Sequence, residues 1–142
     1  VLFDLIVNHV PAPDVDMDAP FSMLSSILGR DSFLGRMLTG RVYSGVAKVG
    51  MPFKSLNLKG EVVEQGRLTK LLTFQGIKQV PVNEAVAGDI ITIAGVEKTT
   101  VSDTICDISC NTPIQSTPID PPTMAITISV NDSPFAGQEG TK

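Results

Sequence analysis

Residues 38–50 read Leu-Thr-Gly-Arg-Val-Tyr-Ser-Gly-Val-Ala-Lys-Val-Gly, and this stretch indicates the fold. Residues 38–43 have the composition of a strand. Ser44-Gly45 predicts a tight reversal, followed by a short return that turns again at Gly50, because glycine adopts positive φ without a Cβ clash. Gly40 lies inside the strand, where it predicts a bulge or a bend. Two turns so close together favour a small, strongly curved antiparallel sheet.

The composition of the whole chain supports a mostly β domain. Its 142 residues are 42% hydrophobic but only 5% aromatic, with no Trp, so the core must be built from Val, Ile, Leu and Met. Charged residues make up 18%, and twelve Gly and ten Pro predict many turns. The length allows one full domain, or one domain and part of another.

Short apolar runs divided by glycines predict strands over residues 21–29, 33–43, 51–56, 61–74 (broken at Gly66), 76–82, 89–94 and 104–108. Apolar residues at helical spacing predict a helix over residues 2–9, ended by the prolines that follow. Residues 14–20 form an acidic linker, and a proline-rich segment after residue 112 marks a second linker. Residues 124–130 alternate cleanly and predict the opening strand of a further domain, because one strand cannot bury its apolar face alone.

The strand predicted at residues 89–94 contains Ile-Ile-Thr-Ile-Ala and is apolar on both faces. Such a strand must be covered on both sides, as in a closed barrel packed by a loop, a helix or a second domain. We therefore predict an all-β fold, a closed antiparallel β-barrel, with a short N-terminal helical linker and one extra C-terminal strand.

Basic side chains are concentrated in the middle of the chain. The net charge of −4 argues against a non-specific nucleic-acid binder, but residues 30–81 hold nine Lys or Arg against three Asp or Glu. If these cations share one face of a barrel, they would contact phosphates. The alternative, which the spacing supports equally, is that they are dispersed over the surface and keep the protein soluble. The candidate RNA-binding residues are Arg41, Lys48, Lys54, Lys59, Arg67 and Lys70.

Motifs for catalysis or metal binding are weak. The sequence has neither a phosphate-binding loop nor a dinucleotide fingerprint, and no apolar run approaches the roughly 20 residues of a membrane span. His9 has no nearby nucleophile, and Cys106 and Cys110 are too few ligands for zinc and are expected to be reduced thiols. Asp103 and Asp107 suit turns better than an acid/base pair. We expect no catalytic residue, metal or cofactor in this segment.

Several motifs resemble those of one family. Thr39-Gly40-Arg41-Val42-Tyr43-Ser44-Gly45, followed by residues 48–50, is similar to the signature hairpin in the second domain of translational GTPases such as elongation factors Tu and G. Residues 87–91 and 102–106 are similar to two further turns of that domain. The flanking segments narrow the resemblance to the TypA/BipA family: residues 9–16, 20–21, 102–107, 122–123 and 130–140.

The resemblance implies part of a bacterial, cytoplasmic, ribosome-associated GTPase linked to stress adaptation and large-subunit assembly, with no membrane partner. Residues 1–12 would be the end of the GTP-binding domain, 13–115 the β-barrel, and 116–142 a linker and the first strand of an incomplete, elongation-factor-G-like α+β domain. GTP and magnesium would bind in the missing domain. The barrel would dock on ribosomal RNA, with Arg41 and Lys48 nearest to it. The alternative is a rigid spacer that transmits nucleotide state between the neighbouring domains without touching RNA.

Overall fold

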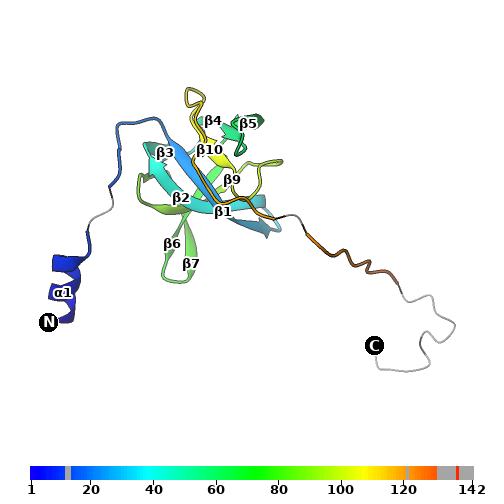
Figure 1. The fold of residues 1–142 in the computed structure, drawn as a ribbon, viewed down its shortest axis with the longest axis horizontal. Coiled ribbons are helices and arrows are strands. Elements are labelled where there is room, and N and C mark those ends of the chain that lie inside the picture. The colour runs from blue at the N-terminus through cyan, green and yellow to red at the C-terminus, as the bar shows by residue number, and fades with distance from the viewer. Residues whose placement is uncertain (12–13, 121, 131–136, 138–142) are drawn as a thin grey trace.

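The computed structural model describes residues 1–11, 14–120, 122–130 and 137, and within them it contains one helix and ten strands (Figure 1). The elements in chain order are α1 (Leu2–His9), β1 (Ser22–Asp31), β2 (Gly35–Ser44), β3 (Val46–Lys48), β4 (Pro52–Leu56), β5 (Val62–Arg67), β6 (Lys70–Gln75), β7 (Lys78–Val82), β8 (Glu84–Val86), β9 (Ile90–Ala94) and β10 (Thr104–Cys106). The helix and every strand predicted before residue 108 are therefore confirmed. Strand β8 was not among the predicted strands.

The predicted break in the strand at residues 61–74 lies at a different place. Gly66 remains in the β4–β5 ladder opposite Phe53, and the interruption falls at Leu68 and Thr69. Leu68 is fully buried and its amide donates to the Met51 carbonyl, whereas the Thr69 amide donates to the Ala94 carbonyl. At this point the chain stops pairing with β4 and begins to pair with β9. The buried side chain of Leu68 therefore marks the break between the two strands.

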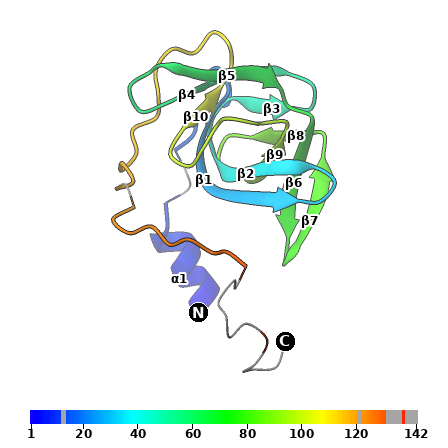
Figure 2. The ribbon, with the colours of Figure 1, turned by 90° about the vertical axis from the view of Figure 1, so that its right-hand side faces the viewer.

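Eight strands form one antiparallel sheet in the order β5-β4-β10-β1-β2-β9-β6-β7, and β3 pairs with β8 in a second, two-stranded sheet. Figure 2 shows the sheets curling around a common interior. Strands β5 and β7 are the edges of the large sheet and do not pair with each other. The strand pairing thus gives a strongly curved all-β domain, and closure of the ring stays a prediction.

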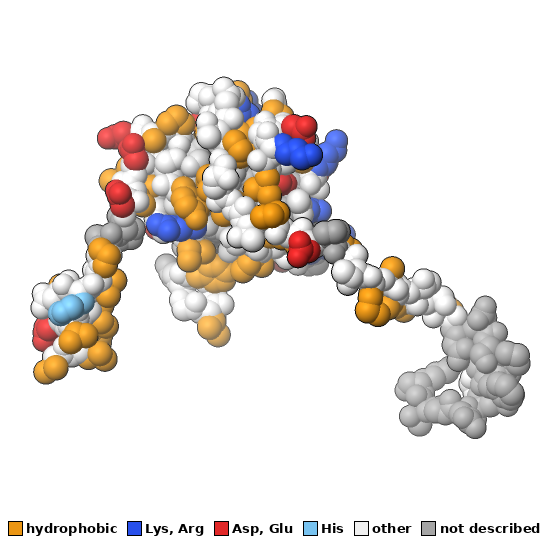
Figure 3. All heavy atoms as spheres, viewed as in Figure 1, with side chains coloured by type: hydrophobic (Ala, Val, Ile, Leu, Met, Phe, Trp, Pro, Cys, Tyr) orange, Lys and Arg blue, Asp and Glu red, His pale blue; other side chains and the backbone are white. Residues whose placement is uncertain are grey.

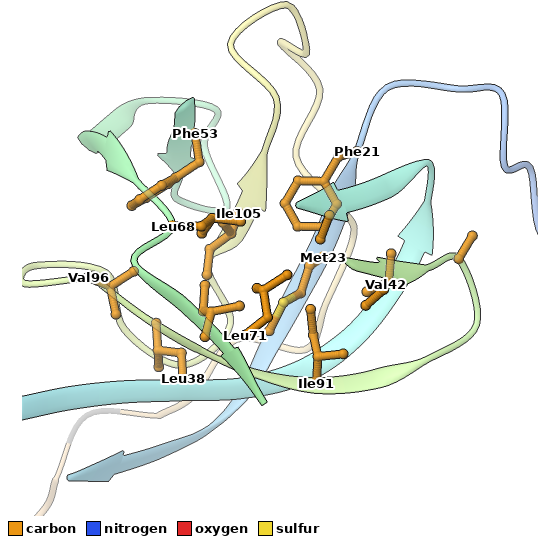
Figure 4. Close-up of a cluster of buried hydrophobic side chains, with 14 residues drawn as sticks. Phe21, Met23, Leu38, Val42, Phe53, Leu68, Leu71, Ile91, Val96 and Ile105 are labelled. Carbon is orange, nitrogen blue, oxygen red and sulfur yellow. The ribbon is translucent and has the colours of Figure 1, made fainter. Parts of the chain in front are cut away.

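One hydrophobic core fills the space inside the curved sheets (Figure 4). Ile91 and Ile93 of β9 are fully buried in it, beside Leu38 and Val42 of β2. Thr92 is also fully buried, and its hydroxyl hydrogen-bonds the hydroxyl of Thr39 at 2.6 Å. The prediction that this strand is covered on both faces is confirmed, because residues 91–94 are all buried.

Gly40 allows two backbones to approach closely in the β1–β2 ladder. It pairs with Ser25, where the register of β1 shifts by one residue at Ser26. A Cβ atom on Gly40 would overlap the carbonyl oxygen of Leu24 and would lie 2.9 Å from the Cε atom of Met23. The irregularity expected at this glycine is present, but its extra residue, Ser26, lies on β1 and not on the strand that contains Gly40; it lets the longest strand pair bend around the core.

The return expected after Ser44-Gly45 is wrong, because β3 does not pair with β2. Gly45 has a φ of +68° and packs against the backbone of Ala19 and Phe21. Its amide donates to the Asp16 carbonyl, and its carbonyl accepts from the Ala87 amide. These contacts turn the chain out of the large sheet, and β3 pairs with β8 instead.

The segments flanking the sheet domain are exposed. No residue of α1 is buried. The strand expected at residues 124–130 is absent: Met124, Ile126, Ile128 and Val130 are 80–89% exposed, and no strand of the described residues pairs with them. An isolated strand has nothing against which to bury its apolar face. The motif quoted at residues 130–140 lies, except for residues 130 and 137, outside the described residues.

Neither the described helix nor any other helical segment in residues 1–11, 14–120, 122–130 and 137 has the length and apolar character needed to cross a membrane.

Gly40→Ala is expected to lower the free energy of unfolding by about 2 kcal/mol or more, because the added methyl group overlaps backbone that cannot move without breaking the ladder. Urea unfolding at neutral pH, followed by circular dichroism, measures the effect. Gly29→Ala is the matched control on β1, since its Cβ would lie 4.0 Å from the nearest atom, the Met37 carbonyl oxygen. Equal midpoints for the two variants would contradict the close-approach argument.

Candidate nucleic-acid interface

The six predicted RNA-binding residues are distributed over several strands and turns. Arg41 lies on β2, Lys48 on β3, Lys59 in the turn between β4 and β5, and Arg67 at the end of β5, and all four are exposed. Lys70 at the start of β6 is half-buried. On the face seen in Figure 3, basic side chains lie mainly at two places on opposite sides of the sheet domain. The basic side chains visible in this view therefore do not form one continuous patch.

Arg41 and Lys48 each have a neighbour that constrains them. The Arg41 guanidinium carbon lies 5.1 Å from the centre of the Tyr43 ring, on the same face of β2. This cation–π contact keeps the guanidinium exposed and oriented, beside an aromatic face. Lys48 Nζ lies 3.8 Å from a carboxylate oxygen of Glu84, and both side chains are exposed, so water and salt screen this pair. Both cations remain accessible to an anionic partner.

Lys54 departs from the expectation of a surface contact because its side chain is only 6% exposed. Its ammonium donates a hydrogen bond of 2.6 Å to Asn111 Oδ1, in the segment that follows β10. The amide of Ile114 also donates to the Thr104 hydroxyl at 2.8 Å. Lys54 thus fastens the exit linker to the sheet, and its charge is not available to RNA.

Arg67 lies in a cleft of about 990 Å³ together with two arginines that the sequence prediction did not include. Arg30 and Arg36 stand directly opposite each other at the end of the β1–β2 ladder. The signal for them was in the sequence, because Arg30 directly follows the first predicted strand and Arg36 lies near the start of the second. The residues lining the cleft are Leu28, Gly29, Arg30, Leu34, Gly35, Arg36, Arg67, Thr69, Gly95, Val96 and Glu97. We call this the arginine cleft.

The loop that forms one wall of the arginine cleft is held by Glu64. Its carboxylate accepts hydrogen bonds from the amides of Glu97 and Lys98 and from the Thr99 hydroxyl, the last at 2.6 Å. Burial acts to raise the pKa of Glu64, but the hydrogen bonds from Thr99, Lys98 and Glu97 outweigh it and hold the pKa below its ordinary value. The charged carboxylate of Glu64 therefore holds residues 97–99 in position.

The other titratable candidates have structural roles. Asp103 accepts from the Thr100 amide at 2.8 Å, and Asp107 accepts from the amide and hydroxyl of Ser109, so both bond to turns as expected. Cys106 and Cys110 are free thiols. Burial and the neighbouring Cys110 raise the pKa of the Cys106 thiol to about 12, so it stays protonated at neutral pH.

Comparison with known proteins agrees with this fold. The family model described as elongation factor Tu domain 2 matches residues 35–106, about half of the chain and most of the sheet domain. The chain therefore belongs to the class of second domains found in elongation factor Tu and related translational GTPases.

Within this class, the curated relatives identify the family. The chain is 38% identical to the large ribosomal subunit assembly factor BipA of Bacillus subtilis and 40% identical to that of Haemophilus influenzae, in each case over 98% of this chain and 22% of the relative. It is 37% identical to the BipA of Synechocystis, over 98% of this chain and 23% of that protein. The chain belongs to the TypA/BipA family, as its motifs indicated, and it spans less than a quarter of the length of these relatives.

Glu64→Gln is expected to lower the stability of the domain at pH 7, because an uncharged amide accepts weaker hydrogen bonds from residues 97–99. The pKa of Glu64 is depressed in the folded state, so its contribution is present above the ordinary glutamate pKa and is lost as the pH falls through the folded value. The difference between wild type and variant should therefore shrink in acid. Urea unfolding at pH 7 and at about pH 3 measures it.

Glu61→Gln is the control, since Glu61 is an exposed carboxylate just before the same strand. It should change stability little at either pH. A difference for Glu64→Gln that stays constant from neutral pH into acid would contradict the role of its charge.

Proposed function

We propose that this chain is the ribosome- and rRNA-docking module of a TypA/BipA-like translational GTPase, and that it performs no chemistry itself. The observation that carries the proposal is the family membership together with the printed name of the relatives, which describes them as large ribosomal subunit assembly factors. In this proposal the parent protein works in the bacterial cytoplasm and takes part in stress adaptation. GTP and magnesium bind in a domain outside this segment.

The exposed cations support RNA as the partner of this module. Arg41, Lys48, Lys59 and Arg67 are all accessible, and Arg41 presents its guanidinium beside an aromatic ring. Cations of this kind contact phosphate oxygens and release counterions, whereas a stacked arginine also meets an unpaired base. The proposal includes a sheet closed into a barrel, since its curvature already encloses one core. Lys54 takes no part in RNA contact because it is buried.

A second candidate function is a rigid spacer that transmits nucleotide state between neighbouring domains. Two hydrogen bonds that fix the segment after β10 favour this function. Lys54 donates to the side chain of Asn111, and the Thr104 hydroxyl accepts from the amide of Ile114. These bonds fix the direction in which the chain leaves the sheet. In this alternative the exposed cations keep the protein soluble and touch no RNA.

Charge reversal of Arg41 and Lys48 together is expected to weaken binding of the chain to ribosomal RNA. The slope of log affinity against log salt concentration should become shallower by about 1 to 2, because each phosphate contact contributes roughly 0.7 to 0.9. Filter binding over a series of KCl concentrations measures both quantities. A flat salt response for the wild-type chain would contradict RNA docking.

Lys54→Met is the matched control, because it removes a cation of the same middle segment that is already buried. Its salt slope should equal that of the wild type, with folding checked by circular dichroism. Unchanged RNA binding in the Arg41 and Lys48 variant would favour the spacer function.

A further inference from the structure

The arginine cleft brings three like charges together. Arg30 and Arg36 are directly opposite in the β1–β2 ladder, where like charges repel. Arg67 joins them from the end of β5, and Glu97 is the single acidic residue among those lining the cleft. Among the lining residues three guanidinium groups stand against one carboxylate, so the lining is net positive, and the Asp103 carboxylate near Arg36 offsets part of that charge. Such a site is stabilised by an anion that accepts from more than one guanidinium.

Arg36 is held in a fixed orientation by the protein. Its Nη2 atom donates to the Thr99 carbonyl at 2.7 Å, and this carbonyl lies at the end of the loop that Glu64 fixes. Its Nε atom is buried and has no hydrogen-bond partner within the described part of the chain. A guanidinium fixed in this way loses little freedom when it binds, so the cleft is organised before a ligand arrives.

The turn at the end of the same ladder carries an exposed aromatic ring. Phe33 is 90% exposed, and it lies between Arg30 and Arg36 in the sequence. Asp31 Oδ1 accepts hydrogen bonds of 2.8 Å from the amides of both Phe33 and Leu34, which fixes the turn. The bonds from Leu34 and Phe33 hold the pKa of Asp31 below its ordinary value, so the carboxylate remains charged at neutral pH. A large apolar ring held in water is a surface on which a base can stack.

We propose that the arginine cleft binds an unpaired nucleotide of a single-stranded RNA segment, with its phosphate between Arg30, Arg36 and Arg67 and its base stacked on Phe33. This inference rests on the proposed RNA-docking function, because it names the form of RNA that the module meets. Leu28, which is 45% exposed, and the half-buried Leu34 supply an apolar wall beside the arginines, which a nucleotide can cover and an inorganic anion cannot. The cleft volume of about 990 Å³ accommodates a nucleotide together with its flanking phosphates.

The test is an NMR titration of the ¹⁵N-labelled 142-residue chain with hexauridylate, followed by the same titration with inorganic tripolyphosphate. Hexauridylate should shift the amides of Gly29, Gly35 and Gly95 saturably, and should bind more tightly than tripolyphosphate. Phe33→Ala should weaken hexauridylate binding about tenfold and leave tripolyphosphate unchanged, because stacking on one aromatic ring has roughly this effect. Arg30→Ala should weaken both probes about tenfold, since it removes a charge-assisted hydrogen bond.

Matched controls separate the site from general effects. Ile77→Ala removes an apolar side chain that is 98% exposed at the β6–β7 turn, and Lys78→Ala removes an exposed cation at the start of β7. Both should bind hexauridylate like the wild type. Arg36→Lys keeps the charge but loses the forked geometry, and should weaken binding without unfolding the chain.

Three results would overturn the inference. Equal effects of Phe33→Ala and Ile77→Ala would remove the stacking role, and equal affinity for the two probes would reduce the cleft to a plain anion site. Hexauridylate shifts confined to the surroundings of Arg41 and Lys48 would move RNA binding elsewhere and leave the docking function intact. The ribosomal RNA filter-binding experiment tests that function independently, so the two proposals fail separately.

Discussion

The structure depends on the close approach of β1 and β2 at Gly40. These are the two longest strands, and between them they pair with β10 and β9 and so hold the two halves of the large sheet together. A side chain at position 40 would separate them, because the Leu24 carbonyl occupies that space. The bulge at Ser26 and the absent side chain at Gly40 let the pair bend. The bend curves the sheet, and the curved sheet encloses the core.

Much of the fold could be predicted from local sequence, because strand composition, glycine turns and helical spacing are local properties. Strand β9, the helix at residues 2–9 and the bend at Gly40 all follow from them. The pairing of β3 with β8 could not be predicted, because it depends on the packing of Gly45 against residues 19–21, which are distant in the sequence. Residues 124–130 have the alternation of a strand, but a segment forms a strand only when another strand pairs with it, and none of the described residues does so.

The candidate site was predictable only in part. The concentration of cations in residues 30–81 is visible in the sequence, but sequence separation does not show which cations share a surface. In the sequence Lys54 and Lys59 look alike, since both are lysines of the basic middle segment. In the structure Lys54 is buried beside Asn111, whereas Lys59 is exposed. Arg30 and Arg36 become a pair only through the β1–β2 register. Two-dimensional strand pairing thus carries the information that a one-dimensional charge pattern lacks.

The edge strands of the large sheet have a consequence for how copies of this chain behave at high concentration. Strand β7 carries Pro81, which has no backbone N–H to offer to an incoming strand. Strand β5 carries Glu64, whose carboxylate draws the loop of residues 97–99 against it. Both borders are therefore poor templates for intermolecular β-pairing, which limits aggregation and domain swapping. A module rich in β-strands can in this way remain separate from its own copies while its other surfaces stay open to a partner.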